Sequence, residues 1–175
     1  MLLAGWIALY AGIAGGGDVI LIPEIPWTFD AVCQAVINRE QRGREFTLIV
    51  VAEGAELPEK GLITQDKQEC QAQVRLGGIG NFVGKEIERR LGKETRTVVL
   101  GHLQRGGNPT TFDRVLATQF GAHAVRLIIE RKFGHMVTYQ PPDMKEVPII
   151  DAIQLAQVCP NCSAVQAARA LGVCF

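Results

Sequence analysis

The segment spanning residues 97–109 constrains the fold of this chain more than any other. It is an apolar run followed by His102, Gln104 and Arg105, then by two glycines, Asn108 and a proline. The apolar run predicts a buried strand over residues 96–100. Asn108 as N-cap and the proline in the first turn predict a helix over residues 110–132. Strand–turn–helix units of this kind build open α/β sheets, which bind ligands at the carboxyl edge of their strands.

The turn itself carries chemistry that suits an anion. His102 and Arg105 would place an imidazole and a guanidinium at that edge, and the adjacent glycines would let backbone N–H groups approach a ligand closely. Two interpretations stay open on spacing alone. The turn is either a phosphate or carboxylate site, or a basic surface turn between a strand and a helix.

Helical patterns alternate with short apolar runs along the rest of the chain, which favours an α/β fold with mostly parallel strands. Strands are expected at residues 18–22, 46–52, 96–100 and 136–139. Helices are expected at residues 5–14, 28–43, 68–76, 81–91 and 110–132, and after residue 149. The long helix carries an apolar stripe of Phe112, Val115, Leu116, Phe120 and Leu127, and a proline-rich link follows at residues 141–142.

Charge and hydropathy exclude several function classes. The chain has 18 basic and 18 acidic residues, a balance that does not suggest a nucleic-acid or membrane-surface protein. No apolar run approaches the ~18 residues of a membrane helix. The first ten residues are apolar but lack the basic start of a signal peptide, so we expect a cytoplasmic protein.

The cysteines do not indicate a disulfide framework. There are 5, an odd number in a chain with no secretory signal. Cys159 and Cys162 form a single C-x-x-C motif, whereas a strong zinc signal needs two such pairs. A metal or redox role and a helix N-terminus that happens to carry cysteines are the alternatives, and the spacing favours the helix N-terminus.

Ionisable side chains stand at the ends of three predicted strands. Asp18 begins the first, Glu53 follows the second, and His102 with Arg105 follows the third. A guanidinium binds phosphate with two hydrogen bonds, an imidazole adds a donor, and a carboxylate accepts from hydroxyl groups. The combination fits a sugar phosphate. For Glu53, an ordinary solvated loop acid remains the alternative.

Two further groups have plain alternatives. Arg42 and Arg44 precede the second strand and could hold a second anion, although basic residues are also common at a solvated helix C-terminus. His123 and His135 are isolated histidines of the kind usually found on surfaces or in cores. The chain has neither the G-x-x-x-x-G-K-[ST] loop of nucleotide-binding proteins nor closely spaced aspartates for Mg²⁺. The residues thus indicate a site for a phosphoryl acceptor without a site for a phosphoryl donor.

Several longer runs of the sequence have a recognisable pattern. They are AGWIALYAGIAGG at residues 4–16, IPE at 22–24, VAEG at 51–54, TRTVVLGHLQRGGNP at 95–109 and FDRVLA at 112–117. Together these runs resemble the second half of a 6-phosphofructokinase, and the resemblance extends over nearly the whole chain. The L-G-H-x-Q-R-G-G run is highly specific for that family.

The resemblance implies a role for each residue of the candidate substrate site. Glu53 would hydrogen-bond a hydroxyl group of fructose 6-phosphate. His102 and Arg105 would hold the 6-phosphate, with Gln104 beside them. Arg96 would reach the 6-phosphate bound in a neighbouring subunit, so the resemblance also implies a homo-oligomer with shared sites.

The resemblance further implies regulation and cofactors. Asp18 would lie at the metal of a regulatory nucleotide, and Arg42 and Arg44 would meet that nucleotide's phosphates. The parent glycolytic kinase uses Mg²⁺ and either ATP or pyrophosphate, but none of these is assured for this chain. Family members carry Met-Gly-Arg where this chain has residues 1–3, and the catalytic base and the nucleotide loops belong to an upstream half.

The resemblance and the patterns together predict an α/β fold in which a three-layer, Rossmann-like lobe with a parallel sheet binds the substrate. Helices belonging to an incomplete second lobe would follow. We expect a substrate lobe over residues 1–103, a remnant of the nucleotide-binding lobe over 104–148, and helices returning to the substrate lobe over 149–175. The expected function is that of a 6-phosphofructokinase fragment without a catalytic base. The alternatives are an inactive sugar-phosphate-binding or regulatory piece and a truncated gene product.

Overall fold

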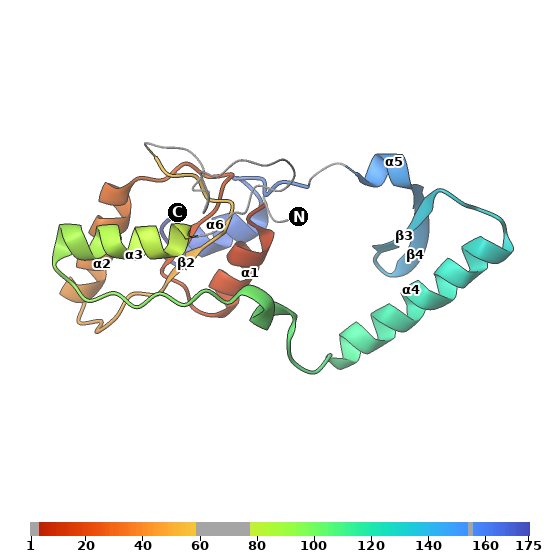
Figure 1. Cartoon of the computed structure of the whole chain (residues 1–175), viewed down its shortest axis with the longest axis horizontal. Helices are drawn as coiled ribbons and strands as arrows, with labels where there is room; N and C mark the ends of the chain where they lie inside the picture. Colours follow the sequence, from red (N-terminus) through yellow and green to blue (C-terminus); the bar gives the residue numbers. More distant parts are fainter. Residues whose placement is uncertain (1–3, 59–77, 154–155) are drawn as a thin grey trace, which may run out of the picture. The chain divides into compact units, whose positions relative to one another are not determined.

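A computed structural model of the chain describes residues 4–58, 78–153 and 156–175. The chain forms two compact units, whose elements are labelled in Figure 1. The first unit comprises Met1–Val99 with Ala156–Phe175, and the second comprises Leu100–Leu155. The expected helix over residues 68–76 and the segment that replaces Met-Gly-Arg lie outside the described residues.

A small parallel sheet lies at the centre of the first unit. Strand β1 (Val19–Leu21) pairs with β2 (Ile49–Val51), and Val19 lies opposite Ile49. On the other edge of β1, the end of the chain adds a parallel bridge in which Ile20 N donates to the carbonyl of Cys174 at 2.8 Å. The two expected strands form, but they are shorter than the apolar runs that predicted them.

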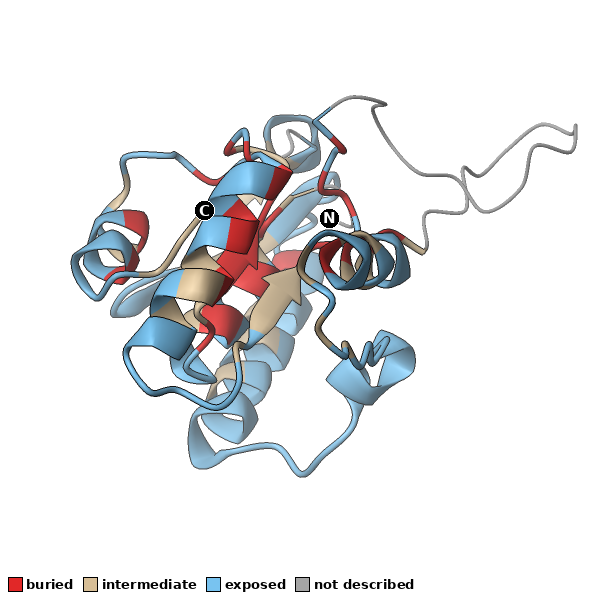
Figure 2. Ribbon diagram, turned by 90° about the vertical axis from the view of Figure 1, so that its left-hand side faces the viewer, coloured by how far each residue is buried: buried red, intermediate tan, exposed pale blue. Residues whose placement is uncertain are grey.

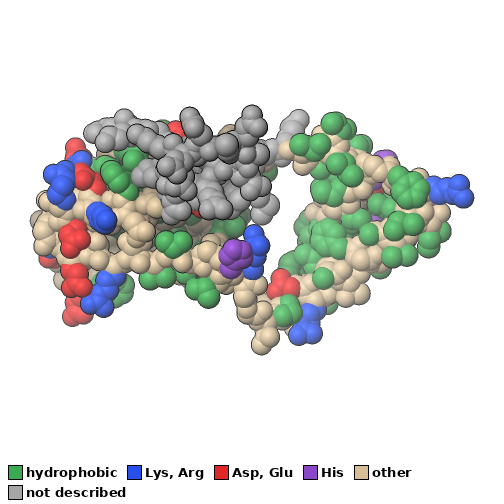
Figure 3. All heavy atoms as spheres, in the orientation of Figure 1, with side chains coloured by type: hydrophobic (Ala, Val, Ile, Leu, Met, Phe, Trp, Pro, Cys, Tyr) green, Lys and Arg blue, Asp and Glu red, His purple; other side chains and the backbone are tan. Residues whose placement is uncertain are grey.

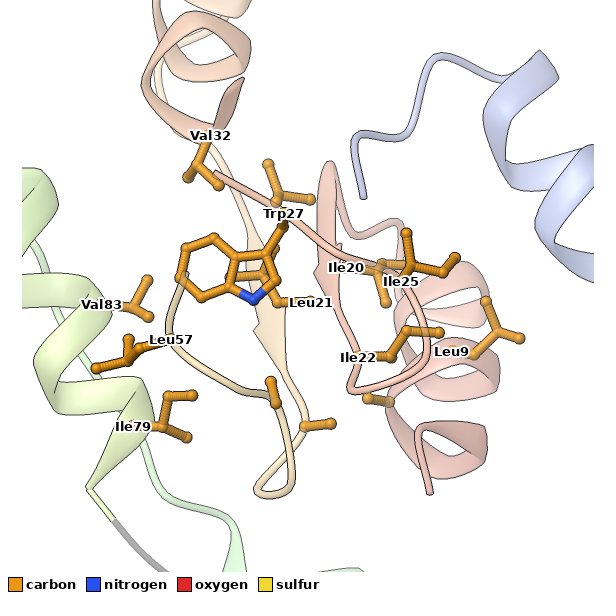
Figure 4. Close-up of a cluster of buried hydrophobic side chains, with 14 of the residues drawn as sticks. Leu9, Ile20, Leu21, Ile22, Ile25, Trp27, Val32, Leu57, Ile79 and Val83 are labelled. Carbon is orange, nitrogen blue, oxygen red and sulfur yellow. The ribbon is translucent and has the colours of Figure 1, made fainter. Parts of the chain in front are cut away.

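In the described part of this unit, the helices around the sheet are α1 (Trp6–Ala14), α2 (Phe29–Gln41), α3 (Ile79–Leu91) and α6 (Ser163–Ala170). Helix α1 approaches β1 so closely that a Cβ atom on Gly12 would lie 2.6 Å from Cδ1 of Ile20. Figure 4 shows Leu9 of α1 beside Ile20 and Ile22. The buried residues of this unit gather on β1 and on the helix faces that surround it (Figure 2).

The second unit is a long helix packed on a hairpin. It contains a 3₁₀ turn η1 (Gly101–Arg105), α4 (Thr111–Ile129), β3 (His135–Gln140), β4 (Asp143–Pro148) and the short α5 (Ile149–Ala152). Strands β3 and β4 are antiparallel, and the ring of Phe112 on α4 meets that of Tyr139 edge-on at 6.4 Å. The expected strand at residues 136–139 is confirmed. The expected link at residues 141–142 is the turn of the hairpin, so β4 was missed.

Two local predictions are wrong. Residues 96–100 form no strand, and Val98 and Val99 are 75% and 69% exposed. An apolar run becomes a strand only when a sheet edge is available to pair with it. In addition, α4 is capped by Thr110 rather than by Asn108. The Thr110 and Asp113 side chains each bond the other's backbone N–H in a reciprocal capping box.

The architecture is therefore mixed α/β with a small parallel sheet. Of the expected three-layer, Rossmann-like lobe, the described residues show the parallel pair β1–β2 with its helices, and the third predicted strand does not pair.

Candidate functional site

Glu53 lies in the turn that follows β2. The strand ends at Val51, and the N–H of Ala55 donates to the carbonyl of Ala52 at 3.0 Å, which closes the turn around Glu53. The Glu53 side chain is exposed. This position at the carboxyl end of a parallel strand is the one predicted from the sequence, and it leaves the carboxylate available to a ligand.

A second carboxylate, Glu24, supports the same end of the sheet. Oε1 and Oε2 of Glu24 accept from the N–H of Gly5 at 2.9 and 3.1 Å, and Oε1 also accepts from Val158 N at 3.0 Å. Glu24 thus ties the start of α1 and the returning C-terminal segment to the residues after β1. Sequence reasoning assigned Glu24 no role, although an acid directly after a predicted strand was a usable signal.

Arg96 lies on the segment that follows α3. Its side chain is 87% exposed, and its guanidinium lies 3.0 Å from Oε1 of Glu94. An exposed ion pair of this kind contributes little to stability. The guanidinium is therefore free to exchange Glu94 for another anion.

The turn η1 carries the three remaining substrate candidates. His102, Gln104 and Arg105 are all exposed. Side chains three residues apart in a 3₁₀ turn lie on the same face, so His102 and Arg105 share a face and Gln104 does not. The glycines on either side, Gly101 with φ +49° and Gly107 with φ +97°, adopt left-handed conformations that favour glycine.

The candidate substrate residues are thus divided between the units. Glu53 and Arg96 belong to the first unit, and His102, Gln104 and Arg105 belong to the second. Each group keeps a charged, exposed side chain, but only Glu53 follows a strand as predicted, because no strand forms before His102 and Arg105. Their joint action on one ligand remains a prediction.

Asp18, predicted to meet a regulatory nucleotide's metal, is already paired. Its Oδ1 lies 2.6 Å from Nη1 of Arg39, and its Oδ2 accepts from the N–H of Leu48 at 2.8 Å. Arg39 also donates to the carbonyl of Phe46 at 3.3 Å. Sequence reasoning assigned Arg39 no role.

A cavity of about 350 Å³ opens beside this pair, and its walls come from α1, α2 and the segment after α6. Asp18, Arg39 and Arg42 line the cavity, whereas the exposed Arg44 is not among its lining residues. Arg42 is the C-cap of α2, as the solvated helix-end interpretation expected. The arrangement offers two guanidinium groups and one neutralised carboxylate.

A Mg²⁺ ion at Asp18 does not fit this arrangement. Both carboxylate oxygens are occupied by Arg39 and Leu48, and a hard cation needs several oxygen ligands. Among the residues that the structure describes, no three His, Cys, Asp or Glu side chains are grouped to hold a metal.

The Cys159–Cys162 pair forms the turn before α6, with Cys162 as N-cap, which confirms the interpretation as a helix N-terminus.

The other histidines have structural partners. Nε2 of His123 on α4 lies 3.3 Å from Oε2 of Glu146 on β4, and Nδ1 of His135 lies 3.1 Å from the carbonyl of Phe133. No helix in the described part of the chain has the length and apolar character needed to span a membrane.

Comparison with known proteins places these features in a family. The phosphofructokinase family profile matches residues 3–128. An ATP-dependent 6-phosphofructokinase of Chloroflexus aurantiacus is 48% identical over 172 residues, which cover 98% of this chain and 47% of that protein. A pyrophosphate–fructose 6-phosphate 1-phosphotransferase of Streptomyces coelicolor is 47% identical over 150 residues, covering 85% of this chain and 44% of that protein.

Solved structures show the same relationship. A phosphofructokinase of Pichia pastoris in the T-state matches with a TM-score of 0.64 and 31% identity, over 85% of this chain and 15% of that one. A pyrophosphate-dependent phosphofructokinase of Marinobacter aquaeolei matches in fold, with a TM-score of 0.71 and 21% identity. That match covers 99% of this chain and 46% of that one. This chain belongs to the phosphofructokinase family and spans about half the length of the curated relatives it matches.

Proposed function

We propose that this chain forms the fructose 6-phosphate side of a 6-phosphofructokinase. In the intact kinase the terminal phosphoryl group of ATP or pyrophosphate passes to the 1-hydroxyl of the sugar. An ATP-dependent relative and a pyrophosphate-dependent relative match this chain at similar identity. The choice of donor therefore stays open within the proposal, and the chain by itself contributes the acceptor's binding groups.

The shared face of His102 and Arg105 on η1 carries this proposal. A guanidinium and an imidazole on one face, next to glycines that leave the backbone accessible, suit the three oxygens of a sugar phosphate. Glu53 would accept a hydroxyl hydrogen bond from the sugar, and Gln104 would support the phosphate end. Within the described residues no side chain is assigned as catalytic base.

The proposal includes a division of labour along the chain. Residues 1–103 would form the substrate lobe, residues 104–148 would belong to the nucleotide-binding lobe, and residues 149–175 would return to the substrate lobe. The exposed Arg96 would serve the 6-phosphate of a neighbouring copy, which makes the proposed kinase a homo-oligomer.

The cavity beside Asp18 supports a second, regulatory site for an anion. Arg42 lines it, and the paired Arg39 adds a second guanidinium. Because Asp18 is occupied, we propose that an effector's phosphate groups bind there without a metal ion. Inorganic phosphate should therefore bind equally well with and without Mg²⁺, and Arg42→Ala should weaken that binding.

Titration calorimetry with fructose 6-phosphate tests the substrate site. A hydrogen bond to a charged group contributes roughly 1.5–3 kcal/mol, so Arg105→Ala should weaken binding about tenfold or more. Arg114→Ala removes an exposed basic side chain of the same unit and is the matched control. Equal affinity of the wild type and Arg105→Ala would show that the phosphate does not bind at η1.

A coupled assay tests the limits of the isolated chain. With fructose 6-phosphate and either ATP or pyrophosphate we expect no turnover, because positioned donor and metal groups supply most of the rate in phosphoryl transfer. Sustained turnover that follows the protein through purification would refute this expectation.

A further inference from the structure

The segment that carries Arg96 packs against two glycines on α3. Gly80 and Gly84 are four residues apart and therefore lie on one face of the helix. A Cβ atom on Gly84 would lie 2.8 Å from Oγ1 of Thr97 and 3.3 Å from Oγ1 of Thr95, and a Cβ atom on Gly80 would lie 3.4 Å from Cγ2 of Thr97. Thr95 and Thr97 thus pack directly on the backbone of α3.

The contact between Gly84 and Thr97 is the closest of these, and it leaves no room for a methyl group at position 84. Real Cβ atoms essentially never approach other heavy atoms within 3.0 Å. Thr97 is β-branched, so a rotation that moves its hydroxyl group away from position 84 also moves its methyl group from its place against Gly80. A methyl group at position 84 must therefore push the whole segment away from α3.

The packing of the two threonines decides where Arg96 points. Thr95 and Thr97 both face α3, and the side chain between them faces away from the helix, where it is 87% exposed. Residues 92–100 form no strand, so no sheet ladder sets the position of this segment. The contact of the threonines with α3 positions the backbone on both sides of Arg96, and the ion pair with Glu94 is the contact of its guanidinium.

We propose that Gly84 and Thr97 are positioning residues for Arg96. Their complementary sizes seat the segment on α3 and direct the guanidinium outward, toward the phosphate of a ligand held by a second copy of the chain. The assignment to a phosphate rests on the proposed function. The seating of the segment does not, and it can be measured separately.

Limited proteolysis measures the seating directly. Trypsin cleaves after Arg96, and Gly84→Ala should accelerate this cleavage about tenfold, which corresponds to about 1.4 kcal/mol, within the cost of one extra methyl group in a packed site. Gly121→Ala is the matched control, because Gly121 lies inside α4 with open space around its missing Cβ. It should leave the cleavage after Arg96 unchanged.

The double variant Gly84→Ala/Thr97→Ala provides the decisive rescue. Removing the hydroxyl and methyl groups of Thr97 makes room for the methyl group at position 84, so cleavage after Arg96 should return to near the wild-type rate. A general loss of folding would not be restored in this way. Wild-type cleavage in Gly84→Ala, or fast cleavage that persists in the double variant, would overturn the proposal.

Fructose 6-phosphate titrations then separate the inference from the proposed function. We expect Arg96→Ala and Gly84→Ala each to weaken binding several-fold, and the double variant to restore it. If Arg96→Ala weakens binding and Gly84→Ala does not, the positioning role is wrong and the substrate site stands. If the wild-type chain binds no fructose 6-phosphate, the proposed function falls, and the phosphate role of Arg96 falls with it. The proteolysis result then still tests whether Gly84 and Thr97 hold the segment against α3.

Discussion

The two units of the chain are stabilised in different ways. Among the described residues, every buried apolar side chain except Leu127 lies in the first unit. The second unit exposes large apolar side chains on α4 and the hairpin, among them Phe112, Val125 and Ile129. Figure 3 shows hydrophobic side chains over α4 and the hairpin.

The polar contacts of the second unit reinforce this difference. Lys132 Nζ lies 2.8 Å from Oε1 of Glu146 and 3.1 Å from Oε2 of Glu130, and His123 adds a contact to Glu146 from α4. These ties join α4 to the hairpin at the surface, where ion pairs contribute little. The first unit thus holds a core of its own, whereas the described residues of the second unit leave an apolar surface exposed.

Self-association provides the largest expected effect. Burying each large apolar side chain of α4 contributes about 1.5–3 kcal/mol, so the isolated chain should associate at high concentration. Replacing Phe112, Val125 and Ile129 together by serine should abolish this association in light scattering. Phe46→Ser removes a 75% exposed side chain of the first unit and should change little. A monodisperse wild-type monomer would contradict the comparison.

Truncation of the first core gives the next largest effect. Leu9 is fully buried against β1, and Leu9→Ala should lower the free energy of unfolding by about 2–5 kcal/mol. Both tryptophans, Trp6 and Trp27, lie in the first unit, so tryptophan fluorescence during urea unfolding reports on that unit. Ile129→Ala should leave this transition in place. An equal shift in both variants would mean that the units unfold as one.

The helix caps give a smaller, matched comparison. Thr28 caps α2 by accepting from Ala31 N, and Thr110 caps α4 in a capping box. Each threonine-to-alanine change should cost about 1 kcal/mol locally. Thr28→Ala should shift the tryptophan transition, whereas Thr110→Ala should only speed hydrogen exchange in the first turn of α4. A shift of the tryptophan unfolding transition in Thr110→Ala would contradict the expectation that the two units unfold independently.

Acid titration gives the smallest effect. Hydrogen bonds from Arg89 and Arg90 lower the pKa of Glu86 from 4.5 to about 2. A carboxyl group with a lowered folded-state pKa stabilises the protein above its unfolded pKa, and this contribution is lost as the pH falls from about 4.5 toward 2. Glu86→Gln should therefore flatten the acid dependence of the tryptophan transition.

The matched change in the second unit is Glu146→Gln. Hydrogen bonds from Lys132 and then His123 lower the pKa of Glu146, so its contribution is also lost toward low pH. Because Glu146 lies in the second unit, its replacement should leave the acid dependence of the tryptophan transition unchanged. A changed acid dependence of the tryptophan transition in Glu146→Gln would show that the two units unfold together.

Local patterns predicted most of the helices and the first two strands. The apolar spacing in α2 and α3 and the Thr28 cap are short-range signals, so the periodicity of the chain reveals them directly. The exposed position of Glu53 was predictable in the same way because the strand before it forms, whereas the strand expected before His102 and Arg105 does not. The capping box at Thr110 was also readable but was passed over in favour of Asn108 two residues earlier.

Contacts between distant residues were not predictable in this way. The Asp18–Arg39 pair, the three hydrogen bonds of Glu24 and the fit of Thr97 on Gly84 join positions that no spacing rule connects. The hairpin also escaped prediction, because residues 141–142 were interpreted as a link and β4 has a weak alternation of buried and exposed residues.

The sequence by itself determined the approximate positions of most helices, which residues carry charge and which family the chain resembles, since these depend on neighbours a few positions apart. Only the tertiary structure decided that residues 96–100 remain unpaired, that Asp18 is occupied by Arg39, and that the core is concentrated in one unit. The physical reason is that pairing and burial depend on which surfaces meet. A strand forms only beside an available edge, and an apolar side is buried only where another element covers it.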